Sequence, residues 1–134
     1  MLEGIHHINF LVADLDAAIL RYKDLFDIDA MTIESLPERG VRTARFKLSG
    51  VWIVLVQPVD EQSEPMRHLR EHGEGLYLVS FAVDDLDAAT DDLVAKGAID
   101  KAAKSREGLQ GWRVIDLEPD AVFGALIQLT QDKN

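Results

Sequence analysis

The alternation of apolar and polar residues is clearest in two stretches, residues 5–12 and 76–83, which are rich in Ile, Val, Phe and Leu and predict two β-strands. Each is followed by an aspartate, Asp14 or Asp85, at a position suited to capping a helix N-terminus. Beyond each cap the apolar spacing becomes that of an amphipathic helix. The predicted buried stripes are Leu15, Ala18, Ile19, Tyr22, Leu25 and Phe26 in one helix and Leu86, Ala89, Leu93 and Val94 in the other. Gly97 is expected to end the second helix in a left-handed conformation.

Three further strands are expected after each helix. They cover about 30–36, 41–48 and 51–57 in the first set and about 99–103, 112–117 and 125–131 in the second. The polar connection between the sets predicts a short helix of its own, because Ser63 can cap it and Pro65 suits its first turn. Gly73 and Gly75 are expected to end that helix.

The two sets are copies of one another. Residues 9–18 (NFLVADLDAA) and 80–89 (SFAVDDLDAA) are identical at seven of ten positions, at an offset of 80 − 9 = 71. A second match, GVWIVLVQ at 50–57 with GALIQLTQ at 124–131, has an offset of 74. Internal repeats of this kind indicate duplicated structural units. The sequence therefore predicts an α+β fold of two βαβββ modules in one domain, comprising module 1–58, connection 59–73 and module 74–134.

Each module would leave one sheet face uncovered by its helix, and we expect the two faces to form a cup. Strand alternation puts Ile8, Phe10 and Val12, with Val79, Phe81 and Val83, on the helix side. The predicted cup lining consists of His7, Asn9, Trp52, Val54, Leu78, Ser80 and Gln128. His7, Val54, Leu78 and Gln128 occupy four equivalent positions of the repeat. By the same alternation, the side chain of His6 is expected on the opposite face from His7.

Composition narrows the classes of partner. The net charge is 14 − 24 = −10, which disfavours binding to nucleic acid or to anionic membrane surfaces. The absence of Cys excludes disulfides, zinc–thiolate sites and thiol nucleophiles. The first ten residues, MLEGIHHINF, do not resemble a signal peptide, and no apolar run is long enough to cross a membrane. A cytoplasmic protein that binds a small molecule is the expectation.

Five motifs, HHINFLVADLDAAI, LPERGVRTARFKL, SEPMRHLREHGEGL, FAVDDLDAA and GALIQLTQ, together resemble the glyoxalase, bleomycin-resistance and extradiol-dioxygenase (vicinal oxygen chelate) superfamily. The resemblance covers about residues 5–131 and is greatest to methylmalonyl-CoA epimerase. It implies the cup-shaped fold and a site at the four equivalent positions. In that superfamily these positions hold a divalent metal, commonly through His, Glu or Gln, His and Glu.

This chain departs from that ligand pattern. Only His7 matches it as it stands, Gln128 replaces the usual Glu, and Val54 and Leu78 have no donor atoms. A divalent metal site generally needs three or more protein donors, so we expect no metal and no cofactor. Epimerisation also needs an acid and a base on opposite sides of the reacting carbon. The resemblance places those carboxylates at Thr43 and Gln128, so epimerase activity is not expected.

Three functions stay open on the sequence. The first is a protein that binds a small, largely apolar molecule in the cup. The second is a metal-independent isomerase, lyase or cyclase with His7 as general base, marked by an imidazole that titrates near neutral pH. The third is a structural or regulatory protein whose cup is filled by side chains. A homodimer is expected, because members of the superfamily often pair.

Other polar and aromatic residues have less specific patterns. His68 and His72 share a helix face without a third ligand, so a structural role is expected. Arg42 and Arg113 match across the repeat and are expected at a solvated edge, with an acidic ligand group as the alternative. Trp112 is expected in a cup wall or a subunit contact.

Overall fold

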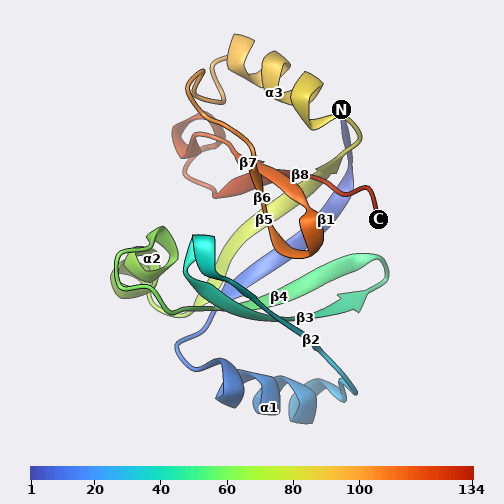
Figure 1. Cartoon of the computed structure of the whole chain (residues 1–134), viewed down its shortest axis with the longest axis vertical. Coiled ribbons are helices and arrows are strands. Elements are labelled where there is room, and N and C mark those ends of the chain that lie inside the picture. The colour runs from blue at the N-terminus through green and yellow to red at the C-terminus, as the bar shows by residue number, and fades with distance from the viewer. The chain divides into compact units, whose positions relative to one another are not determined.

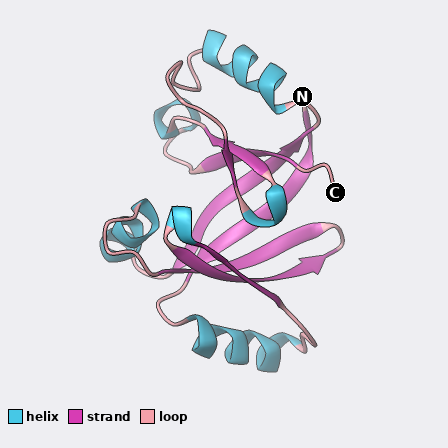
Figure 2. Cartoon of the chain, in the orientation of Figure 1, coloured by secondary structure: helices cyan, strands magenta, loops and turns pink.

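The computed structural model describes residues 1–134 and contains eight strands and three α-helices. The elements in chain order are β1 (Leu2–Leu11), α1 (Leu15–Phe26), β2 (Thr32–Leu36), β3 (Val41–Leu48), β4 (Val51–Pro58), α2 (Glu64–His72), β5 (Gly75–Val83), α3 (Leu86–Ala95), β6 (Arg106–Glu107), β7 (Arg113–Asp116) and β8 (Ile127–Gln131), as Figures 1 and 2 show. The chain divides into two compact units. The first unit is Ile8–Tyr77, and the second unit consists of Met1–His7 with Leu78–Asn134.

The first unit contains the last residues of β1 and the strands β2 to β4, in the order β2-β3-β4-β1. The strands β2, β3 and β4 pair antiparallel, with Ala44 opposite both Ile33 and Leu55. Helix α1 packs on this sheet (Figure 1). Its core consists of Val12, Leu15, Ile19, Ala44 and Leu55, with Phe10, Ala18, Tyr22 and Met31 around them.

The second unit repeats this arrangement with a different set of residues. Its strand order is β1-β5-β8-β7-β6, in which β5 and β8 are parallel while β8, β7 and β6 are antiparallel. Helix α3 packs on β7 and β8. Its core consists of Val83, Leu86, Ala89, Ile99, Ile115 and Leu129, with Phe81, Leu93, Val94 and Leu117 around them. The α+β class and the βαβββ order are therefore confirmed, whereas the cup stays a prediction.

The duplication extends to matching hydrogen bonds at the helix starts. Asp14 accepts a hydrogen bond from the backbone N–H of Ala17, and Asp85 accepts one from Ala88, so both predicted caps are confirmed. A second donor at each start is satisfied by a glutamine of the last strand. The N–H of Leu15 donates to Gln57 at 2.9 Å and that of Leu86 donates to Gln131 at 2.8 Å. Each module thus binds its helix to its last strand through an amide.

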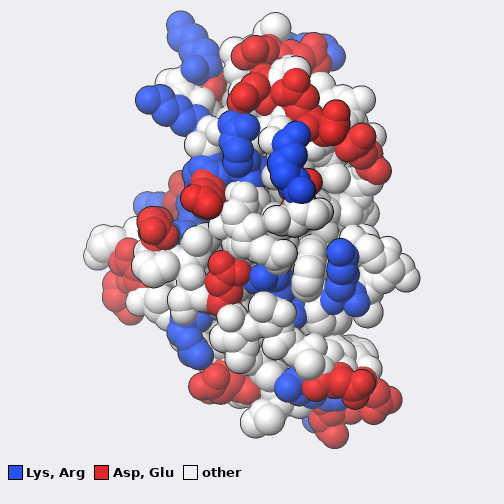
Figure 3. Space-filling view, turned by 45° about the vertical axis from the view of Figure 1, so that its right-hand side comes forward, with Lys and Arg blue, Asp and Glu red and all other residues white.

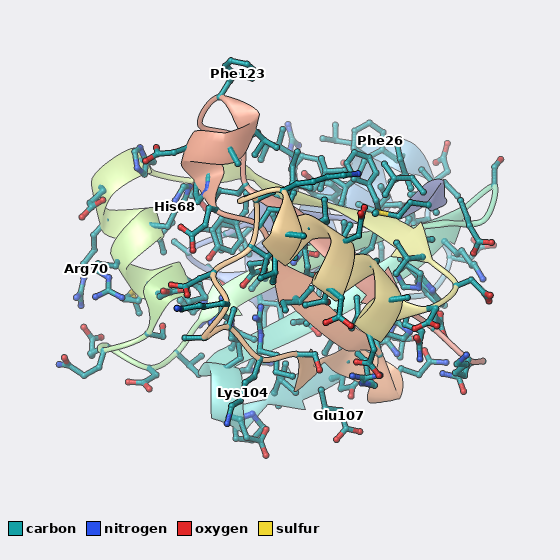
Figure 4. The ribbon with its side chains drawn as sticks, turned by 90° about the horizontal axis from the view of Figure 1, so that it is seen from above. Phe26, His68, Arg70, Lys104, Glu107 and Phe123 are labelled. Carbon is teal, nitrogen blue, oxygen red and sulfur yellow. The ribbon has the colours of Figure 1, made fainter.

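The connection also forms its predicted helix. Ser63 accepts a hydrogen bond from the N–H of Met66, Pro65 lies in the first turn, and Gly73 closes α2 with an N–H bond to the carbonyl of Leu69. Gly97 follows α3 with a positive φ of 80°, as predicted. Figure 4 labels His68 and Arg70 on this connecting helix.

Two local predictions are wrong. Residues 99–103 are not a strand, because the Asp100 side chain accepts a hydrogen bond from the N–H of Ala102 and holds a turn there. The strand at this position, β6, is only Arg106–Glu107. The apolar stripe of α1 is buried at Leu15 and Ile19, but Leu25 and Phe26 are 51% and 62% exposed in its last turn.

Candidate functional site

His7 lies in the second unit, among polar side chains that are buried with it. Its Nδ1 atom is 2.8 Å from Nδ1 of His6, and its ring stacks on Trp112 with centroids 5.0 Å apart. Trp112 is 1% exposed and also meets the ring of His6 edge-on, at 4.5 Å. The indole therefore covers both imidazoles. Trp112, for which the sequence predicts a cup wall or a subunit contact, is thus a direct partner of His7.

The proximity of His6 and His7 corrects the prediction that their side chains lie on opposite faces of the strand. Two rings that meet through Nδ1 atoms at 2.8 Å share one side of the backbone locally. Side-chain alternation holds only where a strand is regularly pleated, and a local irregularity can re-aim a side chain. Both histidines are buried, at 9% and 4% exposure.

The two histidines belong to a longer chain of interacting side chains. At one end, Nε2 of His6 is 2.8 Å from Oδ2 of Asp132. At the other end, the Gln128 side chain interacts with His7 and donates from Nε2 to Oδ1 of Asp116 at 3.3 Å. Nη1 of Arg106 then donates to the other oxygen of Asp116 at 2.8 Å. The chain runs in the order Asp132, His6, His7, Gln128, Asp116 and Arg106.

Burial dominates the electrostatics of His7. Desolvation, followed by the neighbouring His6, lowers the pKa of His7 from 6.5 to about 3, against smaller opposing effects of Gln128 and Asp132. The imidazole is therefore neutral at neutral pH. Burial is the largest single effect and raises the pKa of Asp132, but the hydrogen bonds with His6 and Asn134 and the charge of His6 together outweigh it, so the pKa is lowered overall. Asp132 is a carboxylate at neutral pH.

The remaining predicted lining residues are divided between the units. In the second unit, Leu78 is buried, and the hydroxyl of Ser80 hydrogen-bonds that of Thr130, with both residues fully buried. In the first unit, Val54 is fully buried and Asn9 is half-buried. Whether these residues converge with His7 stays a prediction.

Trp52, also in the first unit, has two cations close to its ring. The Arg45 guanidinium and the Lys47 ammonium are each 5.2 Å from the centre of its ring. Arg45 is 3% exposed and pairs with Glu34 at 2.7 Å. Offsets of the repeat place Asp116 at the position equivalent to Arg45, so the two modules carry an ion pair of reversed polarity at this point.

The residues present do not fit the divalent metal of the superfamily pattern. No group of three or more His, Asp or Glu side chains is arranged to hold an ion. Of the positions of that pattern in the second unit, His7 and Gln128 have donor atoms and Leu78 has none. Two protein donors are fewer than a divalent ion generally requires. At the position of the epimerase carboxylate, Thr43 is 2% exposed and donates its hydroxyl to the carbonyl of Glu34.

The other sequence candidates have structural partners. Arg42 pairs with Asp16 and Arg113 with Asp87, which are equivalent pairs between the last-but-one strand and the helix of each module. The rings of His68 and His72 lie 4.4 Å apart on α2, and the His68 ring is 4.8 Å from Tyr77. These contacts agree with the structural role expected for His68.

Two further surface features, an acidic cluster and a cavity, lie apart from the predicted pocket residues. Acidic side chains gather in the second unit, as Figure 3 shows in red, and those just before and along α3 are Asp84, Asp85, Asp87, Asp91 and Asp92. A surface cavity of about 420 Å³ beside them is lined by residues that include Met1, Leu2, Val83 and Ala88, and by none of the predicted pocket residues. The longest helix has 12 residues, and none is long and apolar enough to cross a membrane.

Comparison with known proteins agrees with this architecture. Residues 6–115 match the family described as the glyoxalase/bleomycin resistance protein/dioxygenase superfamily. The chain belongs to this superfamily. Methylmalonyl-CoA epimerase from Streptomyces coelicolor, solved with 2-nitronate-propionyl-CoA, matches the whole of both chains at a TM-score of 0.93 and 29% identity. The resemblance to epimerases of the superfamily is therefore confirmed in structure.

Curated members of the superfamily give the same result. The mitochondrial methylmalonyl-CoA epimerase of Mus musculus is 28% identical over 97% of this chain and 74% of its own length. The ethylmalonyl-CoA/methylmalonyl-CoA epimerase of Cereibacter sphaeroides is 27% identical over 98% of this chain and 99% of its own. These identities leave room for the replaced side chains at the site.

Sequence reasoning missed much of the polar chain around His7. Asp132 lies just beyond the last predicted strand, and Asp116 near the end of another, where nothing distinguished them from solvated carboxylates. The repeat could have indicated the Arg106–Asp116 pair, because both positions have ionised counterparts in the first module.

Proposed function

We propose that this protein binds a small, largely apolar molecule without a metal, through the site that other members of the superfamily use for their ion. The presence of Val54 and Leu78 at two positions where the superfamily has metal ligands supports this function, because both side chains are buried and favour contact with hydrocarbon. The enclosed neutral imidazole of His7 and the amide of Gln128 provide the polar component. Ligand pockets commonly combine an apolar wall with a few polar anchors.

The observation that carries the proposal is the side-chain oxygen of Gln128. Gln128 is 5% exposed, and its Oε1 atom is buried without a hydrogen-bond partner. Buried polar atoms are nearly always satisfied, and leaving one unsatisfied costs about 1–3 kcal/mol. A bound molecule that donates to Oε1 removes this cost. The hydrogen bond itself is expected to contribute about 1 kcal/mol.

General-base catalysis by His7 gains no support from the site. A base that works at neutral pH has a pKa near that pH, whereas burial lowers the pKa of His7 to about 3. Epimerisation through two carboxylates gains none either, because Thr43 and Gln128 stand at those positions. We therefore expect no exchange of the α-proton of methylmalonyl-CoA with D₂O in the presence of this protein.

The test compares three proteins by native mass spectrometry after gentle purification. The wild type is expected to carry a bound organic molecule. Gln128→Met, which keeps the side-chain volume but removes the amide, is expected to carry roughly five to ten times less, as for the loss of about 1 kcal/mol or somewhat more. Gln62→Met, at an exposed amide of the connection, is the matched control and should retain it. A wild type without any bound molecule, or unchanged binding by Gln128→Met, contradicts the proposal.

A further inference from the structure

The hydrogen-bond roles at the two ends of the polar chain are fixed by chemistry. The carboxylate of Asp132 can only accept, so His6 donates to it from Nε2 at 2.8 Å. At the other end the guanidinium of Arg106 can only donate, so Asp116 accepts from it and from Nε2 of Gln128. The orientation of the Gln128 amide follows, because its oxygen would be repelled by Asp116.

Between these ends, the Nδ1 atoms of His6 and His7 lie 2.8 Å apart and share one proton. If His6 is neutral with its proton on Nε2, its Nδ1 is a lone pair and the shared proton belongs to His7. The other arrangement makes His6 an imidazolium and moves the His7 proton to Nε2. The second arrangement puts a charged imidazolium at a side chain that is only 9% exposed, and taking a charge out of water costs free energy that the neutral arrangement avoids. The burial of His6 therefore favours the first arrangement.

We propose that Asp132 is a positioning residue that acts through His6 to hold His7 as the Nδ1–H tautomer, with the lone pair on Nε2. Trp112 supports this state by covering both rings and excluding water from the shared proton. A hydrogen-bonded partner on one ring nitrogen decides which tautomer a histidine adopts, and here the partner is itself set by a carboxylate. Asp132 lies 125 residues from His7 in the sequence, since 132 − 7 = 125.

This inference deepens the proposed function. The ligand preference that follows from it rests on the proposal that a molecule binds at His7. In this state His7 Nε2 and Gln128 Oε1 are both acceptors. The complementary group of a bound molecule is then a hydroxyl or an N–H group, whereas a carboxylate or a ketone would face two lone pairs. The tautomer itself is measured without any ligand, so its failure and the failure of the binding proposal are distinguishable.

The experiment is a long-range ¹H–¹⁵N correlation spectrum of the whole protein with ¹⁵N-labelled histidine, recorded near pH 8. The chain has four histidines, which single His→Gln variants assign. We expect His7 with a protonated Nδ1 and a bare Nε2, His6 with the reverse, and a scalar coupling between the two Nδ1 nitrogens across the hydrogen bond. The wild-type spectrum is enough to overturn the proposal, if it shows a protonated Nε2 on His7 or two protonated nitrogens on His6.

Two variants test the role of Asp132. Asp132→Ala should replace the single His7 tautomer by a mixture and remove the coupling, while Asp132→Asn, whose amide oxygen still accepts from His6, should restore both. Asp29→Ala, at an exposed aspartate of the first unit, should leave the spectrum unchanged. If Asp132→Ala keeps the wild-type tautomer, Asp132 does not position His7. Should Asp132→Ala fail to fold, the wild-type and Asp132→Asn spectra still decide which tautomer is present.

Discussion

Acidification should destabilise this protein through His7 well before its carboxylates are protonated. The unfolded chain binds a proton at His7 as the pH falls below 6.5, whereas the folded chain keeps the imidazole neutral down to about pH 3. Between these values the unfolded state binds more protons, so the free energy of unfolding falls with pH. Each pH unit costs 1.36 kcal/mol for a fully shifted group, which gives about 3 kcal/mol between pH 6.5 and pH 4.

The assay is urea unfolding at a series of pH values, for the wild type and for His7→Gln. The variant should start from lower stability, because it loses the stacking on Trp112, but its curve should be flatter by about 3 kcal/mol over this interval. Gln62→Ala is the control, since Gln62 is exposed and carries no titratable group, and should keep the wild-type slope. Asp132 does not confuse the comparison, because its lowered pKa confines its contribution to pH values below about 4. Equal slopes for the wild type and His7→Gln would refute the burial of a neutral imidazole.

Three further outcomes are expected. Leu78→His combined with Val54→Glu supplies four donors with His7 and Gln128, so the double variant should bind Co²⁺ and gain about 2.7 kcal/mol of stability at a metal concentration 100 times Kd; a folded variant that gains no metal shows that the positions do not converge. Gln57→Ala and Gln131→Ala should each lower the free energy of unfolding in urea by about 1 kcal/mol, because each leaves a helix N–H without its acceptor. Wild-type stability in both variants would contradict a stabilising role of these two hydrogen bonds. Light scattering at micromolar concentration should report a homodimer, and a monomer would reject that proposal.

The repeat made most of the fold predictable. Because an identical pattern occurs twice, each assignment in one module checked the other, and the caps at Asp14 and Asp85 fixed where the helices start. The failure at residues 99–103 came from a segment with one buried apolar residue, Ile99, where a local aspartate turn competes with strand pairing. The exposed end of α1 shows that apolar spacing predicts a face without predicting how far the sheet extends beneath it.

The site was harder to predict because its chemistry depends on contacts between distant residues. Alternation identified His7 and Gln128, which the structure brings together. It could not indicate the contact between His6 and His7, because alternation places the side chains of adjacent residues on opposite faces. Nor could it indicate Asp132 or Trp112, whose partners are set by how β1, β7 and β8 meet within the second unit.

Metal-free ligand binding is tested most directly by measuring what the purified protein carries. Elemental analysis and native mass spectrometry of the same preparation should show an organic molecule and no stoichiometric Co, Ni, Mn, Zn or Fe, because Val54 and Leu78 remove two of the four donor positions. Close to one equivalent of a divalent metal in the wild type, lost in His7→Ala, would contradict the account.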